Sequence, residues 1–239
     1  MVSLKEKFKF LEDGVDFPFY NDIPKLSTVE WLLLLTPVII MLILLSVPEL
    51  RTEYKPIIIC LIMLIPALYV CKGDYSLFFK KPRKRDIPTI ILCVIASYVY
   101  TMLIAYILIN IFGIPISGNA VLSEFKSPSI FLIIGSLMQL LGEEFFKIFM
   151  LLIIMHVVYK LTNNRGTSIA VGLILTLVIF GFAHYRAYNG KILQILLIQG
   201  FGSIFDLYAY MKTKNVVVSY IIHVIIDYIP FILTMLGST

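Results

Sequence analysis

Long apolar stretches recur along the whole sequence and limit what it can fold into. Seven of them could cross a membrane: 29–48, 55–72, 88–113, 129–158, 168–187, 192–211 and 215–236. A helix needs about 20 mostly apolar residues to span the hydrocarbon core. Of the 239 residues, 59% are hydrophobic and 15% are charged, against about 25% charged in a soluble domain. A water-soluble core could not bury this much apolar surface, so the chain is predicted to be an integral membrane protein.

Helices rather than strands are predicted for all seven spans, because a backbone in lipid must satisfy its own hydrogen bonds. The predicted fold is an all-α polytopic membrane protein with about seven transmembrane helices. Residues 1–28 are expected to form an N-terminal cytoplasmic or interfacial segment, and residues 29–239 the transmembrane domain. The weakest span is 192–211, because polar residues and glycines interrupt it: Gln194, Gln199, Gly200, Gly202 and Asp206.

The Lys and Arg residues predict how the chain is oriented. With seven spans, fourteen of the 20 lie on the side of the N-terminus, five lie on the other side, and Lys147 lies within a span. Since cytoplasmic loops are enriched in these residues, the N-terminus is predicted to be cytoplasmic and the C-terminus external. The basic residues separate apolar blocks instead of lining one face, so the expected partner is the lipid bilayer and not nucleic acid. The Ile/Lys-rich composition is typical of a bacterial plasma-membrane protein.

The fourth span contains Glu143, Glu144 and Lys147. A charged residue at the centre of a span costs about 2.5–3.5 kcal/mol on insertion scales, so these residues indicate either a functional site or an ion network that locks helices together. Glu143 and Lys147 are four residues apart and are predicted to pair. Glu144 points about 100° away around the helix, which leaves it for another partner.

Two further spans carry ionisable groups that could join this site. His184 ends the fifth span, and the seventh contains His223 and Asp227, which share one helix face because they are four residues apart. Their chemistry alone leaves a hydrolytic site and a transport or proton-relay site equally open. His156 lies near the end of the fourth span, on another side of the helix from Glu143, and is predicted not to take part.

Together these motifs resemble the CAAX-protease and bacteriocin-processing family of intramembrane proteases, also called the Abi or Rce1-type family. Its usual pattern is Glu-Glu-x-x-x-Arg, then Phe-x-x-x-His, then His-x-x-x-Asn or Asp. The similar residues here are Glu143-Glu144 with Lys147 matched to the arginine, Phe180 with His184, and His223 with Asp227. The segment 208–215 also resembles the link between the family's last two core helices. The resemblance covers about 129–230.

The resemblance implies an intramembrane endopeptidase with a polar catalytic cavity. Glu143 would be the general base, and His184 would hold and polarise the attacking water. His223, with or without Asp227, would stabilise the oxyanion. Glu144 would complete the water site or anchor Lys147, and Lys147 and Phe180 would support the site.

The expected substrate is a peptide precursor or a membrane protein, in bacteriocin or pheromone maturation or in related self-immunity. No cofactor is expected to be required. Two histidines and a glutamate are also a familiar zinc set, so Glu143, His184 and His223 would be the ligands if a metal is present. The alternatives are a non-catalytic bacteriocin immunity protein and a proton-coupled transporter, although the sequence shows no inverted repeat. The sequence does not define an oligomeric state.

If Glu143 and His184 share one site, the fourth span must place Glu143 at the same membrane depth as His184. Counted at 1.5 Å per residue, Glu143 and His184 fall at different depths if both spans fill the hydrocarbon core from their first residues. The fourth span, with its 30 residues, is therefore predicted to kink or to extend well outside the hydrocarbon. Glu143, Glu144, His184 and His223 are predicted to surround one polar cavity, with polar atoms within about 8 Å of one another.

Overall fold

The computed structural model describes residues 8, 16–46, 54–118 and 129–236, and within them it is helical and contains no strand. The long helices, in chain order, are α2 (Thr28–Ser46), α3 (Lys55–Val70), α4 (Ile87–Tyr106), α5 (Ile130–Thr162), α6 (Arg165–Ala183), α8 (Ile204–Thr213) and α9 (Val216–Leu236). The short elements are η3 (Tyr75–Leu77), η4 (Lys84–Asp86), η5 (Ile107–Ile111), α7 (Ile192–Gln194), η7 (Ile195–Gly200) and η8 (Phe201–Ser203).

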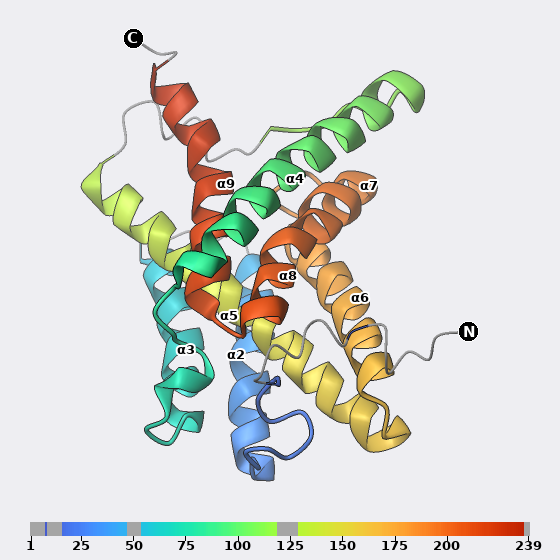
Figure 1. Cartoon of the computed structure of the whole chain (residues 1–239). Coiled ribbons are helices and arrows are strands. Elements are labelled where there is room, and N and C mark those ends of the chain that lie inside the picture. The colour runs from blue at the N-terminus through green and yellow to red at the C-terminus, as the bar shows by residue number, and fades with distance from the viewer. Residues whose placement is uncertain (1–7, 9–15, 47–53, 119–128, 237–239) are drawn as a thin grey trace.

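Within the described part of the chain, six helical segments are long and apolar enough to cross a membrane, and α3, with 16 residues, is a shorter apolar helix. The predicted all-α, multi-pass membrane fold is confirmed. Successive long segments run in opposite directions, so the loops alternate between two ends of the bundle (Figure 1).

Helix α5 is the central element of the bundle and crosses it obliquely (Figure 1). It packs against α3 and α6 along most of its length and also contacts α2 and α9. Its 33 residues form one uninterrupted helix of about 50 Å, which exceeds a hydrocarbon core of about 30 Å. Tilt, or extension beyond the hydrocarbon, therefore accommodates its length without a break in the helix.

The predicted span 192–211 is a helix broken by irregular turns. After α7 the chain forms the π-helical η7 and the 3₁₀ turn η8 before α8 begins. Here α6 and η7 come so close that a Cβ on Gly181 would lie 2.6 Å from the Ile195 carbonyl oxygen, and one on Gly200 would lie 2.6 Å from that of Leu177. Small residues allow such backbone approach in membrane proteins. Glycine is thus needed where the end of α6 meets the broken helix.

A proline also interrupts the hydrogen bonds of α9, and a neighbouring helix compensates. Pro230 has no N–H, so the Ile226 carbonyl four residues earlier lacks its usual donor. The Tyr98 hydroxyl of α4 donates to that carbonyl oxygen at 2.7 Å. Since lipid offers no hydrogen bonds, a freed carbonyl needs such a partner. This bond fixes α4 against α9 directly beside Asp227.

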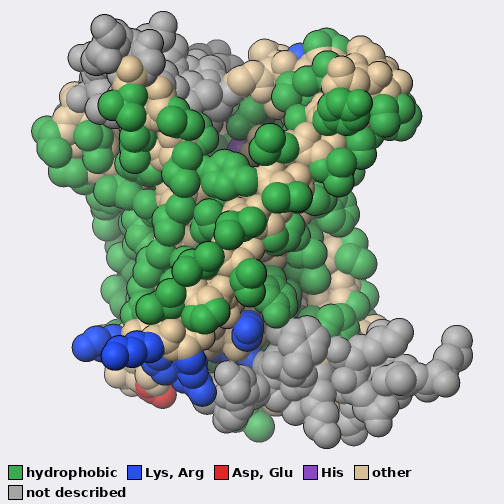
Figure 2. All heavy atoms as spheres, turned by 45° about the horizontal axis from the view of Figure 1, so that its top comes forward, with side chains coloured by type: hydrophobic (Ala, Val, Ile, Leu, Met, Phe, Trp, Pro, Cys, Tyr) green, Lys and Arg blue, Asp and Glu red, His purple; other side chains and the backbone are tan. Residues whose placement is uncertain are grey.

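The described part of the N-terminal segment packs into one end of the bundle. Phe17, Phe19 and Tyr20 are buried in the main apolar core, and the Arg165 guanidinium donates to both carboxylate oxygens of Asp16. Residues 1–7 and 9–15 of the predicted segment lie outside the described residues. Figure 2 shows that Lys and Arg side chains gather along one edge of the molecule, below a broad hydrophobic surface.

Candidate active site

A cavity of about 760 Å³ lies among α4, α5, the end of α6, the 184–190 turn, the broken helix and α9. Five of the predicted residues line it: Glu143, Phe180, His184, His223 and Asp227. Glu144 and Lys147 lie behind its wall and are almost completely buried, with 1% and 0% of their surface exposed. The structure therefore divides the predicted residues into a cavity-facing group and a buried group behind it.

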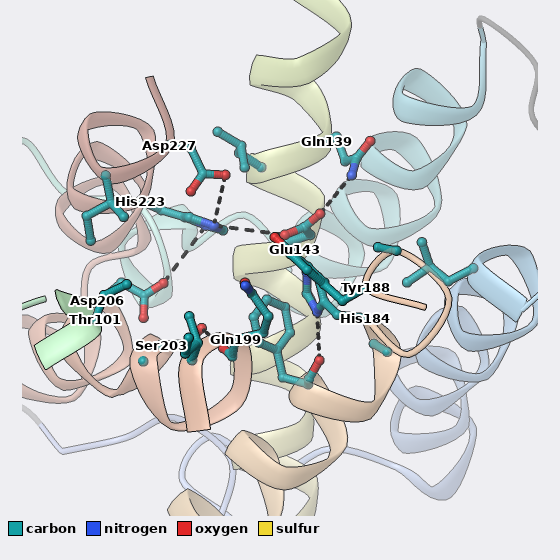
Figure 3. Close-up of a pocket in the computed structure, with 18 of the residues that line it drawn as sticks. Thr101, Gln139, Glu143, His184, Tyr188, Gln199, Ser203, Asp206, His223 and Asp227 are labelled. Carbon is teal, nitrogen blue, oxygen red and sulfur yellow. Dashed lines mark hydrogen bonds and ion pairs between the residues drawn. The ribbon is translucent and has the colours of Figure 1, made fainter. Parts of the chain in front are cut away.

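Glu143 faces the cavity and is not paired with Lys147. Its Oε1 accepts a hydrogen bond from Gln139 Nε2 at 2.8 Å, one turn earlier on α5. Its Oε2 lies 3.9 Å from His223 Nε2. In Figure 3, Glu143 projects into the space between His223 and His184.

The predicted Glu143–Lys147 pair is therefore wrong, because Lys147 pairs elsewhere. Its ammonium lies 2.6 Å from Glu144 Oε1 and also bonds to Asp206 of α8. Residues three and four apart on a helix are both within reach, and the second carboxylate on α8 lies on the Glu144 side. The predicted match of Lys147 to the family arginine is also displaced by one position. Lys147 follows Glu144 by three residues, whereas the family arginine follows the second glutamate by four.

The buried group forms one connected ion network. Lys147 bridges Glu144 and Asp206, and His223 Nδ1 lies 2.8 Å from the same Glu144 oxygen that Lys147 contacts. The ammonium also sits 4.9 Å from the centre of the Phe180 ring, a favourable cation–π distance. The network joins α5, α6, α8 and α9 at one point, so it fixes the position of the His223 ring.

The His223 ring presents its other nitrogen to the cavity. Because a carboxylate only accepts hydrogen bonds, the bond to Glu144 assigns a proton to Nδ1. Nε2 lies 3.9 Å from both Glu143 Oε2 and Asp227 Oδ2. His223 and Asp227 thus share a face, at a separation longer than a direct hydrogen bond.

His184 is held at the end of α6, where it is the C-cap residue. Its Nδ1 lies 2.9 Å from the Phe180 carbonyl oxygen, and its ring meets the Phe180 ring edge-on at 4.8 Å. A carbonyl only accepts, so Nδ1 carries the hydrogen and the neutral ring leaves the Nε2 lone pair for water or another donor. Glu143 and His184 line the same cavity despite their separation along the chain, as the shared-site prediction required.

Sequence reasoning missed other polar residues at the site, above all Asp206. It is a buried carboxylate inside a predicted span, so the rule that singled out Glu143 applied equally to it. Gln139 precedes Glu143 by one turn, a spacing that could have identified it. Further polar residues of the lining include Thr101, Tyr188, Gln199 and Ser203 (Figure 3). They lie on segments whose approach to α5 the sequence pattern does not define.

His156 lies away from the cavity, next to the N-terminal segment. Its ring stacks on Trp31 with centroids 4.3 Å apart, and its Nδ1 lies 3.1 Å from the Tyr20 carbonyl oxygen. It therefore serves as a packing and hydrogen-bonding group between α5, α2 and the segment before α2.

Among the described residues, the donor atoms close enough together to share a metal ion belong to Glu144, Asp206 and His223, all within 4.8 Å of one another. This group differs from the predicted set of Glu143, His184 and His223. Both of its carboxylates contact the Lys147 ammonium, which already supplies a positive charge where a metal would sit. The group therefore fits a metal poorly.

Fold and site together define a class: a polytopic membrane protein whose paired carboxylates and histidines meet in an intramembrane cavity. Residues 125–229 match the profile of the family described as type II CAAX prenyl endopeptidase, Rce1-like. The chain therefore carries a domain of this protease family at residues 125–229. Comparison with curated proteins and with solved structures gave no match.

Proposed function

We propose that the chain hydrolyses a peptide bond in a peptide precursor or membrane-associated protein with a water molecule activated by Glu143. The observation that supports this most directly is the separation of the two glutamates. Glu144 and Asp206 hold Lys147, while Glu143 faces the cavity, and within the described ranges its close hydrogen-bond donor is Gln139. A carboxylate that is not neutralised by a lysine is available to accept a proton.

In the proposed reaction, Glu143 takes a proton from water as the water oxygen bonds to the peptide carbonyl carbon. His184 Nε2 holds the second hydrogen of that water. The carbonyl oxygen becomes an oxyanion and accepts a hydrogen bond from His223 Nε2, which requires the imidazolium form. The carbon–nitrogen bond then breaks, and Glu143 returns its proton to the amine. The second proton of the water stays on the new carboxyl group until it is released to solvent, so the final products are a carboxylate, an amine and a proton, and no covalent enzyme intermediate forms.

The buried network supports the charge that this role places on His223. Lys147 and an imidazolium at His223 balance the two carboxylates Glu144 and Asp206, which they contact or approach. Asp227, 3.9 Å from Nε2, adds a second acceptor that favours the imidazolium. Removing one member of a buried charge network leaves another uncompensated, so these residues are proposed to act as a unit.

We propose further that the reaction needs no metal. Cleavage should then persist after exhaustive dialysis against a chelator, and elemental analysis should find well below one zinc per chain. Zinc at one per chain that is lost in His184→Ala together with activity would instead make Glu143, His184 and His223 ligands.

The proposed setting is a bacterial plasma membrane with a cytoplasmic N-terminus, and the proposed role is bacteriocin or pheromone maturation or related self-immunity. If the chain protects cells against a bacteriocin through cleavage, Glu143→Gln should abolish protection. A non-catalytic immunity protein would still protect.

The test compares new peptide N-termini in membranes and culture medium from cells that express either wild-type protein or Glu143→Gln. The substitution keeps the size of the side chain and removes its basicity. A protease of the proposed kind produces termini that appear with wild type and disappear with the variant at equal protein levels. Identical sets of termini would contradict the proposal.

A further inference from the structure

The two ends of the helix bundle differ strongly in charge. One end carries the loops before α2, between α3 and α4, between α5 and α6, and between α8 and α9. We call this the basic end, because eleven described Lys and Arg residues lie there: Lys25, Lys72, Lys80, Lys81, Arg83, Lys84, Arg85, Lys160, Arg165, Lys212 and Lys214. The opposite end has three in the described part of the chain: Lys55, Arg186 and Lys191. By the positive-inside rule, the basic end faces the cytoplasm.

The cavity reaches the opposite end of the bundle. It is lined by Leu45 at the end of α2, Lys55 at the start of α3, and the 183–190 turn after α6. Within that turn, Arg186 and Asn189 are both exposed and line the cavity. A histidine side chain is visible in a recess near the edge of the molecule opposite the basic end (Figure 2).

Towards the basic end, the cavity stops at Asp206 and His223. In the described ranges, none of its lining comes from the loops of the basic end. A layer of large aromatic side chains fills the bundle there instead. Phe17, Phe78, Phe145, Phe149 and Tyr210 are each at most 1% exposed. The Phe17 ring of the N-terminal segment contacts Tyr210 of α8, and Phe78 of the loop after α3 contacts Phe145 and Phe149 of α5.

From this placement we infer that the cavity opens to the non-cytoplasmic side, and that its substrate is a polypeptide segment exposed on that side. That a substrate enters the cavity rests on the proposed function, whereas the direction of opening rests on the fold and on the distribution of Lys and Arg. A scissile segment in the cytoplasm would have to pass the buried aromatic layer to reach Glu143. Among the described residues, no such layer lies between the opposite end and the cavity.

The direction of opening can be tested by cysteine labelling. The three native cysteines, Cys60, Cys71 and Cys93, are buried, so an exposed introduced cysteine gives the signal. Asn189→Cys places one at the cavity mouth, Ser203→Cys places one inside it, and Lys81→Cys is a matched control on the basic end. The probe is a membrane-impermeant maleimide applied to spheroplasts and to inside-out vesicles.

The expected result is that Asn189→Cys and Ser203→Cys are labelled in spheroplasts, whereas Lys81→Cys is labelled in inside-out vesicles. Labelling of Ser203→Cys only in inside-out vesicles would overturn the inference, and so would the reverse pattern for Asn189→Cys and Lys81→Cys. Unlabelled parental protein in both preparations serves as the background.

The substrate class is tested by the positions of the Glu143-dependent termini. Termini on exported peptides or on the outer segments of membrane proteins support the inference. Glu143-dependent termini on cytoplasmic segments would overturn it while leaving the proposed function intact. Absence of any Glu143-dependent terminus would overturn both the proposed function and the substrate class, and the labelling result would then decide the direction of opening alone.

Discussion

Lys147 Nζ lies 2.6 Å from Glu144 Oε1, so the lysine of this site serves the second glutamate of the pair and not the first. The Glu143 carboxylate is bonded to the amide of Gln139 instead. Two adjacent residues of one helix turn therefore have different surroundings: one carboxylate belongs to a buried ion network, and the other borders a cavity. This difference gives each glutamate a separate expected role.

Replacing Lys147 by methionine should destabilise the protein by about 3–5 kcal/mol, the usual loss when one partner of a buried ion pair is removed. Glu144 and Asp206 would then have only His223 as a positively charged partner among the described residues, which leaves one of the two carboxylates uncompensated. Chemical unfolding in detergent micelles would measure the change. Lys147→Arg keeps the charge and should lose less, and Lys160→Met, which removes an exposed pair with Asp22, should change stability little. Wild-type stability of Lys147→Met would contradict the network.

The effect of Asp206→Asn on stability should change sign when Lys147 is removed. In the wild-type background Asp206→Asn removes a counter-ion of the lysine and should destabilise the protein. In the Lys147→Met background the same substitution removes an uncompensated charge and should stabilise it. A double-mutant cycle in the same unfolding assay should give a coupling energy at the upper end of about 0.5–3 kcal/mol. Additive effects would place Asp206 outside the network.

The sequence predicted the fold class well because apolar length and the cost of buried charge act locally. The seven apolar runs predicted the ends of the helical segments to within a few residues, if α4 is counted together with the π-turn η5 (Ile107–Ile111) and the broken helix is counted as one segment. The same reasoning identified Glu143, His184, His223 and Asp227, which line one cavity. Rules based on one helix fail where a residue on a second helix determines which side chains pair. Whether Lys147 pairs with Glu143 or Glu144 depends on Asp206, 59 residues away, and no periodicity on α5 could show that.

The broken helix illustrates a second limit. Its polar residues and glycines weakened the case for a span at 192–211, yet they are there because η7 packs directly on the α6 backbone and borders the cavity. A π-helical turn in such a place is common at functional sites. The sequence marked the irregularity without indicating that Gly200 contacts Gly181.

That contact yields a prediction. Gly181→Ala should lower stability and cleavage together, because the new Cβ would lie 2.6 Å from the Ile195 carbonyl oxygen and would force α6 away from η7. His184, three residues later, would move with the helix end. Gly135→Ala on α5 is the matched control, since its Cβ would meet Pro56 at an ordinary 3.6 Å. Unfolding and cleavage measured on both variants would test this, and equal effects would argue against a required close approach.

The Tyr98–Ile226 hydrogen bond should matter because of Pro230. Tyr98→Phe removes the donor to the freed carbonyl and should destabilise the protein by about 1–3 kcal/mol, the penalty for an unsatisfied buried acceptor. In a Pro230→Ala background the helix can supply its own donor, so Tyr98→Phe should cost clearly less there. Chemical unfolding of the four proteins would show the difference. A cost that is the same in both backgrounds would contradict the compensation.

The proposed mechanism depends most on the separate roles of Glu143 as general base and Glu144 as a member of the buried ion network. Its most direct test measures the cleavage rate and the unfolding free energy of Glu143→Gln and Glu144→Gln side by side, on a substrate identified from the Glu143-dependent termini. The account predicts that Glu143→Gln loses about 10²–10⁴-fold in rate, as expected for removal of a general base, with stability near wild type. Glu144→Gln is predicted to lose stability because Lys147 and His223 lose their shared partner. Full activity in a folded Glu143→Gln protein would contradict the account.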